Sequence, residues 1–254
     1  MKKLIIILTL FLIFINCLST EAATKIVKKD IKIVAKDGFA LTATFEYPNI
    51  KGQTEYPTVV LLHSLGYSSE WWGDLPQKFL DQGYAVVFMD FRGHGNSVYN
   101  AKLTRVSWKN LKKAAFAKYP DDVITVLDYI KDENKREFFN NWAIVGSDLG
   151  ASTAICVANK ISYKPKTMVL LSPEINSKGV YVPVQLAELT NVDILSVQGT
   201  GDSAAMNNYE YLGKFAQGTF EPYISSSRST GMLMLKNDKT LSDVITQWVG
   251  QYLK

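Results

Sequence analysis

The stretch "AIVGSDLGAS" (143–152) decides the fold. Its apolar run ends at Gly146, Gly150 follows four residues later, and Asp148 lies midway between the two glycines. This spacing is typical of a tight turn between a strand and a helix, in which the flanking glycines relieve crowding and the middle side chain stands clear of the turn. The stretch therefore predicts a strand, a turn that displays Asp148, and a helix.

Apolar runs of the strand type alternate with helical patterns on both sides of this turn. Strands are expected at 25–35, 40–48, 57–63, 85–90, 142–146, 167–172, 192–199 and 220–227, the first two as an antiparallel pair. Helices are expected at 71–84, 105–117, 120–133, 149–161, 203–216 and 239–253. Continuous apolar strands separated by helices indicate an α/β fold, whose mostly parallel central sheet is flanked by helices on both faces. The length suits a single domain over residues 24–254.

The first 23 residues have a different character. A positive start, "MKK", precedes the apolar run "LIIILTLFLIFI" (4–15) and the small residues of "STEAA" (19–23). This order predicts a signal peptide, cleaved after Ala22 or Ala23, and hence a periplasmic or secreted protein. Cys17, at the end of the apolar run, leaves a lipoprotein signal open, and a retained membrane anchor is a further alternative.

Charge and cysteine content exclude some classes of function. The net charge is +4 for the whole chain and +3 without residues 1–23, which is too small to indicate a nucleic-acid partner. Cys156 is then the one remaining cysteine and lies in an apolar helical pattern, so a buried thiol is expected. No cofactor and no metal site is expected.

Four predicted strands end in segments that contain polar or glycine-rich motifs. These are "LLHSLGYSSEWW" (61–72), "DFRGHGNS" (90–97), "VGSDLGAS" (145–152) and "VQGTGD" (197–202). The carboxyl ends of parallel strands meet at one edge of a sheet, where α/β proteins place their sites. In this order the four segments resemble the α/β-hydrolase superfamily, especially its small esterase and lysophospholipase-like members. The resemblance covers nearly all of residues 24–254 and implies a minimal cap, since the insert at 172–189 is short.

The resemblance assigns roles to the turn and to the loop after the 57–63 strand. It implies that Asp148 stands at the nucleophile place, where serine is usual, on the turn called the nucleophile elbow. The backbone N–H of Leu149, together with that of Ser64 or Leu65, would form the oxyanion hole, which stabilises the negative oxygen of an acyl-transfer intermediate.

The other two members of the superfamily's catalytic triad are one acid and one histidine. Asp202 matches the place of the acid. Thr230, in "SSSRSTGMLML" (225–235), stands at the place of the histidine. The chain has two histidines in all, His63 in the oxyanion loop and His94 in "RGHG", and both are expected to be structural.

Two functions are compatible with an aspartate at the nucleophile place and a threonine at the histidine place. A serine nucleophile needs a base, whereas a carboxylate is already ionised near neutral pH. Haloalkane dehalogenases and epoxide hydrolases of this superfamily use Asp at the nucleophile place but still need the histidine to break the ester intermediate. The chain is thus either a protein without triad catalysis that binds a small acyl- or peptide-like ligand or a partner, or an ester or dehalogenase-like hydrolase with Asp148 as nucleophile and an unidentified base.

Three narrower readings of the turn also stay open. Ser147 could be the nucleophile, although it lies one place early and no histidine serves it. Asp148 and Asp202 could hold a metal ion. Asp148 could simply cap the helix that follows it by accepting backbone N–H bonds.

Overall fold

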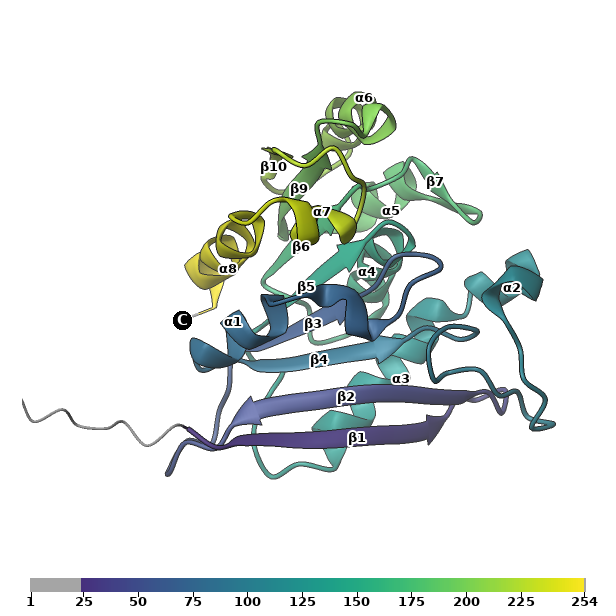
Figure 1. Cartoon of the computed structure of the whole chain (residues 1–254), viewed down its shortest axis with the longest axis vertical. Coiled ribbons are helices and arrows are strands. Elements are labelled where there is room, and N and C mark those ends of the chain that lie inside the picture. The colour runs from purple at the N-terminus through teal and green to yellow at the C-terminus, as the bar shows by residue number, and fades with distance from the viewer. Residues whose placement is uncertain (1–23, 254) are drawn as a thin grey trace, which may run out of the picture.

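One eight-stranded sheet organises the molecule, and the computed structural model describes residues 24–253 of the chain (Figure 1). Its strand order is β1-β2-β4-β3-β5-β6-β9-β10. The bounds are β1 Ile26–Val34, β2 Ala40–Pro48, β3 Thr58–Leu62, β4 Ala85–Asp90, β5 Trp142–Ser147, β6 Thr167–Leu171, β9 Asp193–Gly199 and β10 Phe220–Ser225. Strand β2 pairs antiparallel with both of its neighbours, and every pair from β4 to β10 is parallel. The predicted mostly parallel sheet is confirmed.

Helices cover both faces of this sheet (Figure 1). On one face lie α3 (Tyr119–Asp132) and α4 (Leu149–Lys160), and on the other lie α1 (Leu75–Asp81) and α8 (Leu241–Tyr252). The remaining helices are η1 Ser69–Trp72, η2 Trp108–Asn110, α2 Lys113–Phe116, α5 Val182–Glu188, α6 Ser203–Gly213 and α7 Leu233–Asn237. A small hairpin, β7 (Asn176–Ser177) with β8 (Val180–Tyr181), and α5 occupy the predicted cap insert.

The helix predicted at 71–84 is the clearest difference from the sequence analysis. It consists of two pieces, η1 and α1, with Gly73 between them at φ +61°. A residue with positive φ ends a right-handed helix, and glycine takes this conformation without steric strain.

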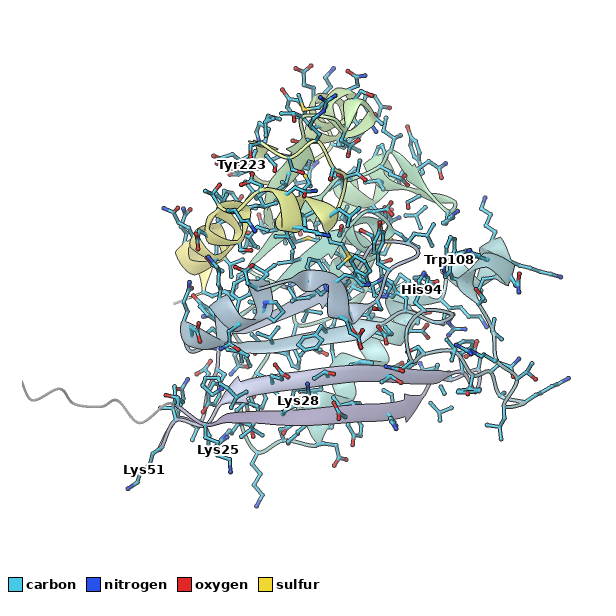
Figure 2. The ribbon with its side chains drawn as sticks, in the orientation of Figure 1. Lys25, Lys28, Lys51, His94, Trp108 and Tyr223 are labelled. Atoms are coloured by element: carbon cyan, nitrogen blue, oxygen red, sulfur yellow. The ribbon has the colours of Figure 1, made fainter. Side chains whose placement is uncertain are left out.

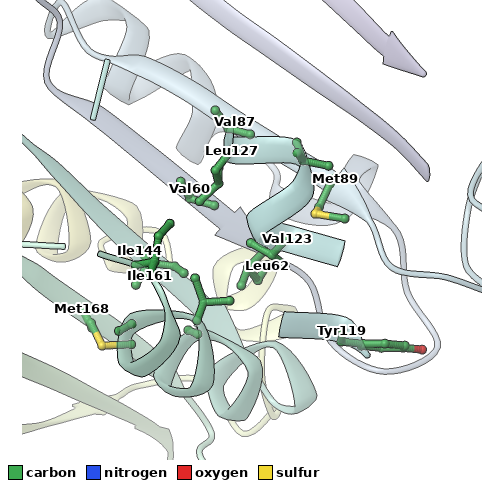
Figure 3. Close-up of a cluster of buried hydrophobic side chains, with 14 of the residues drawn as sticks. Val60, Leu62, Val87, Met89, Tyr119, Val123, Leu127, Ile144, Ile161 and Met168 are labelled. Atoms are coloured by element: carbon green, nitrogen blue, oxygen red, sulfur yellow. The ribbon is translucent and has the colours of Figure 1, made fainter. Parts of the chain in front are cut away.

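The larger hydrophobic core lies between the sheet and the helices α3 and α4, and Figure 3 shows part of it. Side chains of the central strands, such as Val60, Leu62 and Ile144, meet Val123 and Leu127 of α3. All five are fully buried. The central strands are apolar along their whole length because the second cluster, under α1 and α8, buries their other face.

A buried ion pair fixes the segment that follows β4. Arg92 is 3% exposed, and its Nε donates to Asp122 of α3 at 2.6 Å while Nη1 donates to Asp37 at 2.7 Å. Tyr119 donates its hydroxyl to the Arg92 carbonyl at 3.0 Å. Arg92 thus joins the end of β4 to α3 and to the β1–β2 turn.

The predicted signal peptide at 1–23, with Cys17, lies outside the described residues. Across residues 24–253, every helix is too short or too polar to span a bilayer. Cys156 is buried in α4, as expected.

Candidate functional site

The turn at Asp148 has the strained geometry expected of a nucleophile elbow. Asp148 joins β5 to α4 with φ 53° and ψ −115°, and its N–H donates to the Leu171 carbonyl at 2.9 Å. A Cβ at Gly150 would come within 2.1 Å of the Leu62 carbonyl oxygen, and a Cβ at Gly146 within 2.4 Å of the Gly150 carbonyl oxygen. Both positions therefore need glycine, because the backbones of β3, β5 and α4 approach closely here.

The Asp148 carboxylate lies against one of the predicted oxyanion donors. The backbone N–H of Leu65 donates to Asp148 Oδ2 at 3.2 Å. The backbone N–H of Leu149, the other predicted donor, also stabilises the charged form of this carboxylate by hydrogen bonding. The alternative that Asp148 caps α4 is wrong, because Asp148 stands at the N-cap position without a side-chain cap hydrogen bond. Its Oδ2 instead accepts from the loop after β3, where the Leu65 N–H donates to it.

Burial and a neighbouring acid make this carboxyl unusually weak. Burial, together with the smaller effect of the Glu174 carboxylate, raises the pKa of Asp148 to about 6 against the opposing effects of the Leu65 N–H and Lys178. Glu174, which lies three residues after β6, was not singled out in the sequence analysis. Its place just beyond the carboxyl end of a parallel strand was the available signal. Glu174 is thus the acidic residue whose negative charge raises the pKa of Asp148.

Ser64 and Ser147 form a second layer beneath the elbow. Both side chains are buried, and their hydroxyl oxygens lie 2.6 Å apart. The Ser64 N–H points to the sulfur of Met232 at 3.5 Å. Of the two alternatives for the oxyanion donor, Leu65 is thus the one that faces Asp148. The Ser147 hydroxyl is held against Ser64.

The loop after β10, which should carry a histidine, presents backbone to the elbow. Gly231 donates its N–H to the Ser172 hydroxyl at 2.8 Å. A Cβ at Gly231 would lie 3.8 Å from the Asp148 Cβ but only 2.7 Å from Ser64 Oγ. Thr230 is exposed. Position 231 therefore points at the elbow, in a space too small for a side chain, while position 230 lies at the surface.

Asp202 lies beside this loop but serves its own helix. It is 8% exposed, and its Oδ1 accepts from the Ala205 N–H at 3.0 Å, which caps α6. The Thr200 N–H donates to the Ser227 carbonyl at 2.7 Å, so the segment after β9 does lie against the one after β10. In the described part of the chain, no hydrogen bond joins Asp202 to Thr230 or to Asp148.

Both histidines are committed to backbone hydrogen bonds. The N–H of Phe91 donates to His63 Nε2 at 3.0 Å, so the proton of the neutral ring lies on Nδ1, 2.7 Å from the Ser64 carbonyl. The N–H of Gly66 likewise donates to His94 Nε2 at 3.0 Å. Burial lowers the pKa of each ring to about 4. Each ring is neutral at pH 7 and positions the loops after β3 and β4.

The described residues contain no group of three or more His, Cys, Asp or Glu side chains that could hold a metal ion. The backbone N–H groups at the elbow can bind a polar ligand. The carboxylate can attack an electrophilic carbon. Proton transfer would need a base that neither histidine supplies.

Comparisons with known proteins place the chain in a family. A family model described as serine aminopeptidase, S33, matches residues 54–205, which is more than half of the chain. No curated protein sequence matches it.

Solved structures resemble it in fold. An esterase of Pyrococcus furiosus superposes with a TM-score of 0.65 at 16% identity, covering 90% of this chain and 94% of that one. An esterase of Exiguobacterium antarcticum gives 0.64 at 13%, with 87% and 100% covered. A dienelactone hydrolase of Anabaena variabilis gives 0.64 at 13%, with 89% and 99% covered. The chain therefore belongs to the serine aminopeptidase S33 family of the α/β-hydrolase superfamily.

Proposed function

We propose that this α/β-hydrolase-fold protein does not carry out Ser-His-Asp catalysis and instead binds a small acyl- or peptide-like ligand, or a partner, outside the cytoplasm. The observation that carries the proposal is the Asp148 carboxylate against a predicted oxyanion donor, with the Leu65 N–H donating to Oδ2 at 3.2 Å. A substrate carbonyl needs this same donor for its developing negative charge. A carboxylate already bound there competes with it.

The arrangement of possible bases supports the same function. His63 and His94, the two histidines of the chain, each accept a backbone N–H on Nε2. Asp202, at the place of the acid, accepts from Ala205 and has no histidine to orient. Loss of triad members typically reduces turnover by four or more orders of magnitude, and the remainder comes from binding and the oxyanion hole.

A second function, hydrolysis with Asp148 as nucleophile, is favoured by one specific observation. The Leu65 N–H donates to Oδ2 of a carboxylate on a strained turn, which orients that carboxylate for attack. Attack on the carbon of a haloalkane would form an ester bond to Asp148 and release halide, and attack on an epoxide carbon would form an ester whose alkyl group carries the opened oxygen as a hydroxyl. Attack on the acyl carbon of an activated ester would instead form a mixed anhydride with Asp148 and release the alcohol. Hydrolysis of the alkyl esters requires an activated water, so these adducts should accumulate.

Mass spectrometry of the protein after incubation with activated esters, haloalkanes and epoxides tests the two functions. Asp148→Asn is the matched control, because it keeps the shape of the side chain and removes the nucleophile. The expected result is no adduct on either protein and no turnover.

An adduct that maps to Asp148 and disappears in Asp148→Asn would overturn the binding proposal and establish the exchanged nucleophile. Turnover that leaves no adduct and that persists in Asp148→Asn would overturn both functions, because it would require a different catalytic residue.

A further inference from the structure

A cavity beside the loop after β3 has no role in the proposed function, and Asp148 does not line it. It has a volume of about 410 Å³, within the range of small-molecule sites. Gly66 and Tyr67 of the oxyanion loop form one wall, the Gly93–Gly95 segment forms another, and residues 105–110 close it. Figure 2 shows His94 and Trp108 together in this region, near α2.

Aromatic rings and glycine backbone line this cavity. The Trp108 ring stacks on the His94 ring with centroids 5.6 Å apart and an angle of 6° between the planes. Gly66 has φ +84°, and a Cβ there would lie 3.1 Å from Trp108 Cζ2, so the indole rests on bare backbone. Tyr67 adds a second aromatic side chain. Two aromatic side chains beside polar groups favour a planar ligand that also carries a polar substituent.

The charge around the cavity is positive. Arg105 lies at its edge, is exposed, and its guanidinium forms no ion pair or hydrogen bond with the described residues. The Lys109 ammonium lies 5.9 Å from the centre of the Trp108 ring. No Asp or Glu lines the cavity. An unpaired guanidinium can bind a carboxylate through two parallel hydrogen bonds.

We propose that this cavity binds a small aromatic carboxylate, with its ring against Trp108 and Tyr67 and its carboxylate on Arg105. The site is separate from Asp148, so the proposal goes beyond the proposed function and holds whether or not Asp148 reacts. The two sites share one loop, because Leu65 donates to Asp148 and the adjacent Gly66 donates to His94.

Binding of 4-fluorobenzoate, followed by ¹⁹F NMR titration, tests the site. 4-Fluorobenzamide is the matched neutral ligand, with the same ring and no charge. Arg105→Gln removes the guanidinium, and Arg228→Gln makes the same change at another exposed arginine, in the loop after β10. We expect 4-fluorobenzoate to bind at least tenfold more tightly than the amide. Arg105→Gln should abolish this preference, and Arg228→Gln should keep it.

A second readout places the ligand. Contacts from the ring protons of 4-fluorobenzoate to one indole should appear in ¹H–¹H NOE spectra and vanish in Trp108→Phe. Equal affinity for the acid and the amide, equal behaviour of Arg105→Gln and Arg228→Gln, or a contact that persists in Trp108→Phe would each overturn the proposal. Arg105→Gln keeps Asp148 and its hydrogen bond to Leu65, so it should give the same adduct result as the wild type, and failure here is distinct from failure of the proposed function.

Discussion

The identity of one residue, Asp148, changes the chemistry that this turn supports. A serine at this place would leave the N–H groups of Leu65 and Leu149 open to a substrate. The aspartate brings its own acceptor to them, at 3.2 Å from the Leu65 nitrogen. The elbow itself is kept, with φ 53° at Asp148 and glycines at 146 and 150. The strained turn thus displays a carboxylate in this chain.

Replacing Asp148 by asparagine should stabilise the fold in a pH-dependent way. Because the folded-state pKa of about 6 lies above the unfolded value of 3.8, ionisation at pH 8 destabilises the wild type, and protonation restores its stability as the pH falls through 6 toward 3.8. Asp148→Asn lacks this titration. Urea unfolding should show the variant more stable by about 1–3 kcal/mol at pH 8, with the gain shrinking toward zero at pH 4.

Glu174→Gln serves as the control, since it removes the second-largest cause of the raised pKa and leaves Asp148 in place. Relative to the wild type, Glu174→Gln should increase the stability of the fold by less than Asp148→Asn does, and this increase should also shrink toward pH 4. A stability difference between Asp148→Asn and wild type that stays constant from pH 8 to pH 4 would contradict the assignment.

The two histidine rings should stay neutral well below their ordinary range. Since burial lowers both pKa values from 6.5 to about 4, the unfolded chain takes up protons first as the pH falls, and stability is lost between pH 6.5 and 4. Long-range ¹H–¹⁵N NMR spectra should show both rings protonated on Nδ1 at pH 6. A ring that titrates near pH 6.5 would instead be available as a general base.

At the residue scale, the sequence predicted where each site residue lies along the chain. It did not predict which groups that residue contacts. Asp148 was found from local spacing and Asp202 from the resemblance to the α/β-hydrolase superfamily, and both histidines were predicted to be structural. The contact of Asp148 with Leu65 and the effect of Glu174 join three different strand ends. Such long-range contacts depend on side-chain orientation, which motif spacing does not specify.

At the scale of elements, the packing of α4 on β3 depends on Gly150. A Cβ at this position would lie 2.1 Å from the Leu62 carbonyl oxygen, which is backbone and cannot move aside alone. Gly150→Ala should therefore destabilise the fold by about 3 kcal/mol or more, measured by urea unfolding.

Gly250→Ala is the matched substitution in α8, where the one close neighbour is the Tyr84 hydroxyl at 3.6 Å. It should be neutral or stabilising, because alanine favours helix more than glycine does. Similar losses from both substitutions would mean that the close approach at Gly150 is not what requires glycine.

The Arg92–Asp122 pair joins the segment after β4 to α3 and should be sensitive to loss of one partner. Arg92→Met leaves a 2% exposed carboxylate without its guanidinium, which should cost about 3–5 kcal/mol at pH 8. The loss should be smaller at pH 5, because burial already raises the pKa of Asp122 and protonation removes the charge. Denaturant unfolding at the two pH values measures both effects.

Arg92→Met/Asp122→Leu removes both charges and should recover most of the stability. A double variant no more stable than Arg92→Met would show that the arginine acts through its bonds to Asp37 or its packing on Phe39.

The elements that the sequence predicted are the long and strongly patterned ones. Strand β4 matches its predicted range of 85–90, and α3 lies one residue from its own. The elements β7, β8, α5 and α7 were not predicted. Each has seven residues or fewer, which is too short for a periodic pattern, and tertiary contacts determine their conformation.

At the scale of the whole molecule, the fold brings six loops to one edge of the sheet, and the three residues predicted at the triad places differ in their surroundings. Asp148 accepts from Leu65, Asp202 caps α6, and Thr230 lies exposed. The sheet order and the family match are found with these three residues in place. Fold and family therefore do not by themselves determine activity, which depends on the chemistry of a few side chains at the strand ends.

Export concerns the whole molecule, because it determines the compartment in which the protein would bind a ligand. The described sheet starts at Ile26, three residues after the last predicted cleavage site, so removal of residues 1–22 or 1–23 leaves every described strand intact. Expression of the full chain in a bacterium, followed by fractionation and intact-mass measurement, should give a protein outside the cytoplasm that starts at Ala23 or Thr24. A mass consistent with a lipid-modified Cys17 at the N-terminus, in the membrane fraction, would establish the lipoprotein alternative. A full-length mass in the membrane would establish a retained anchor, and a full-length mass in the cytoplasm would contradict export altogether.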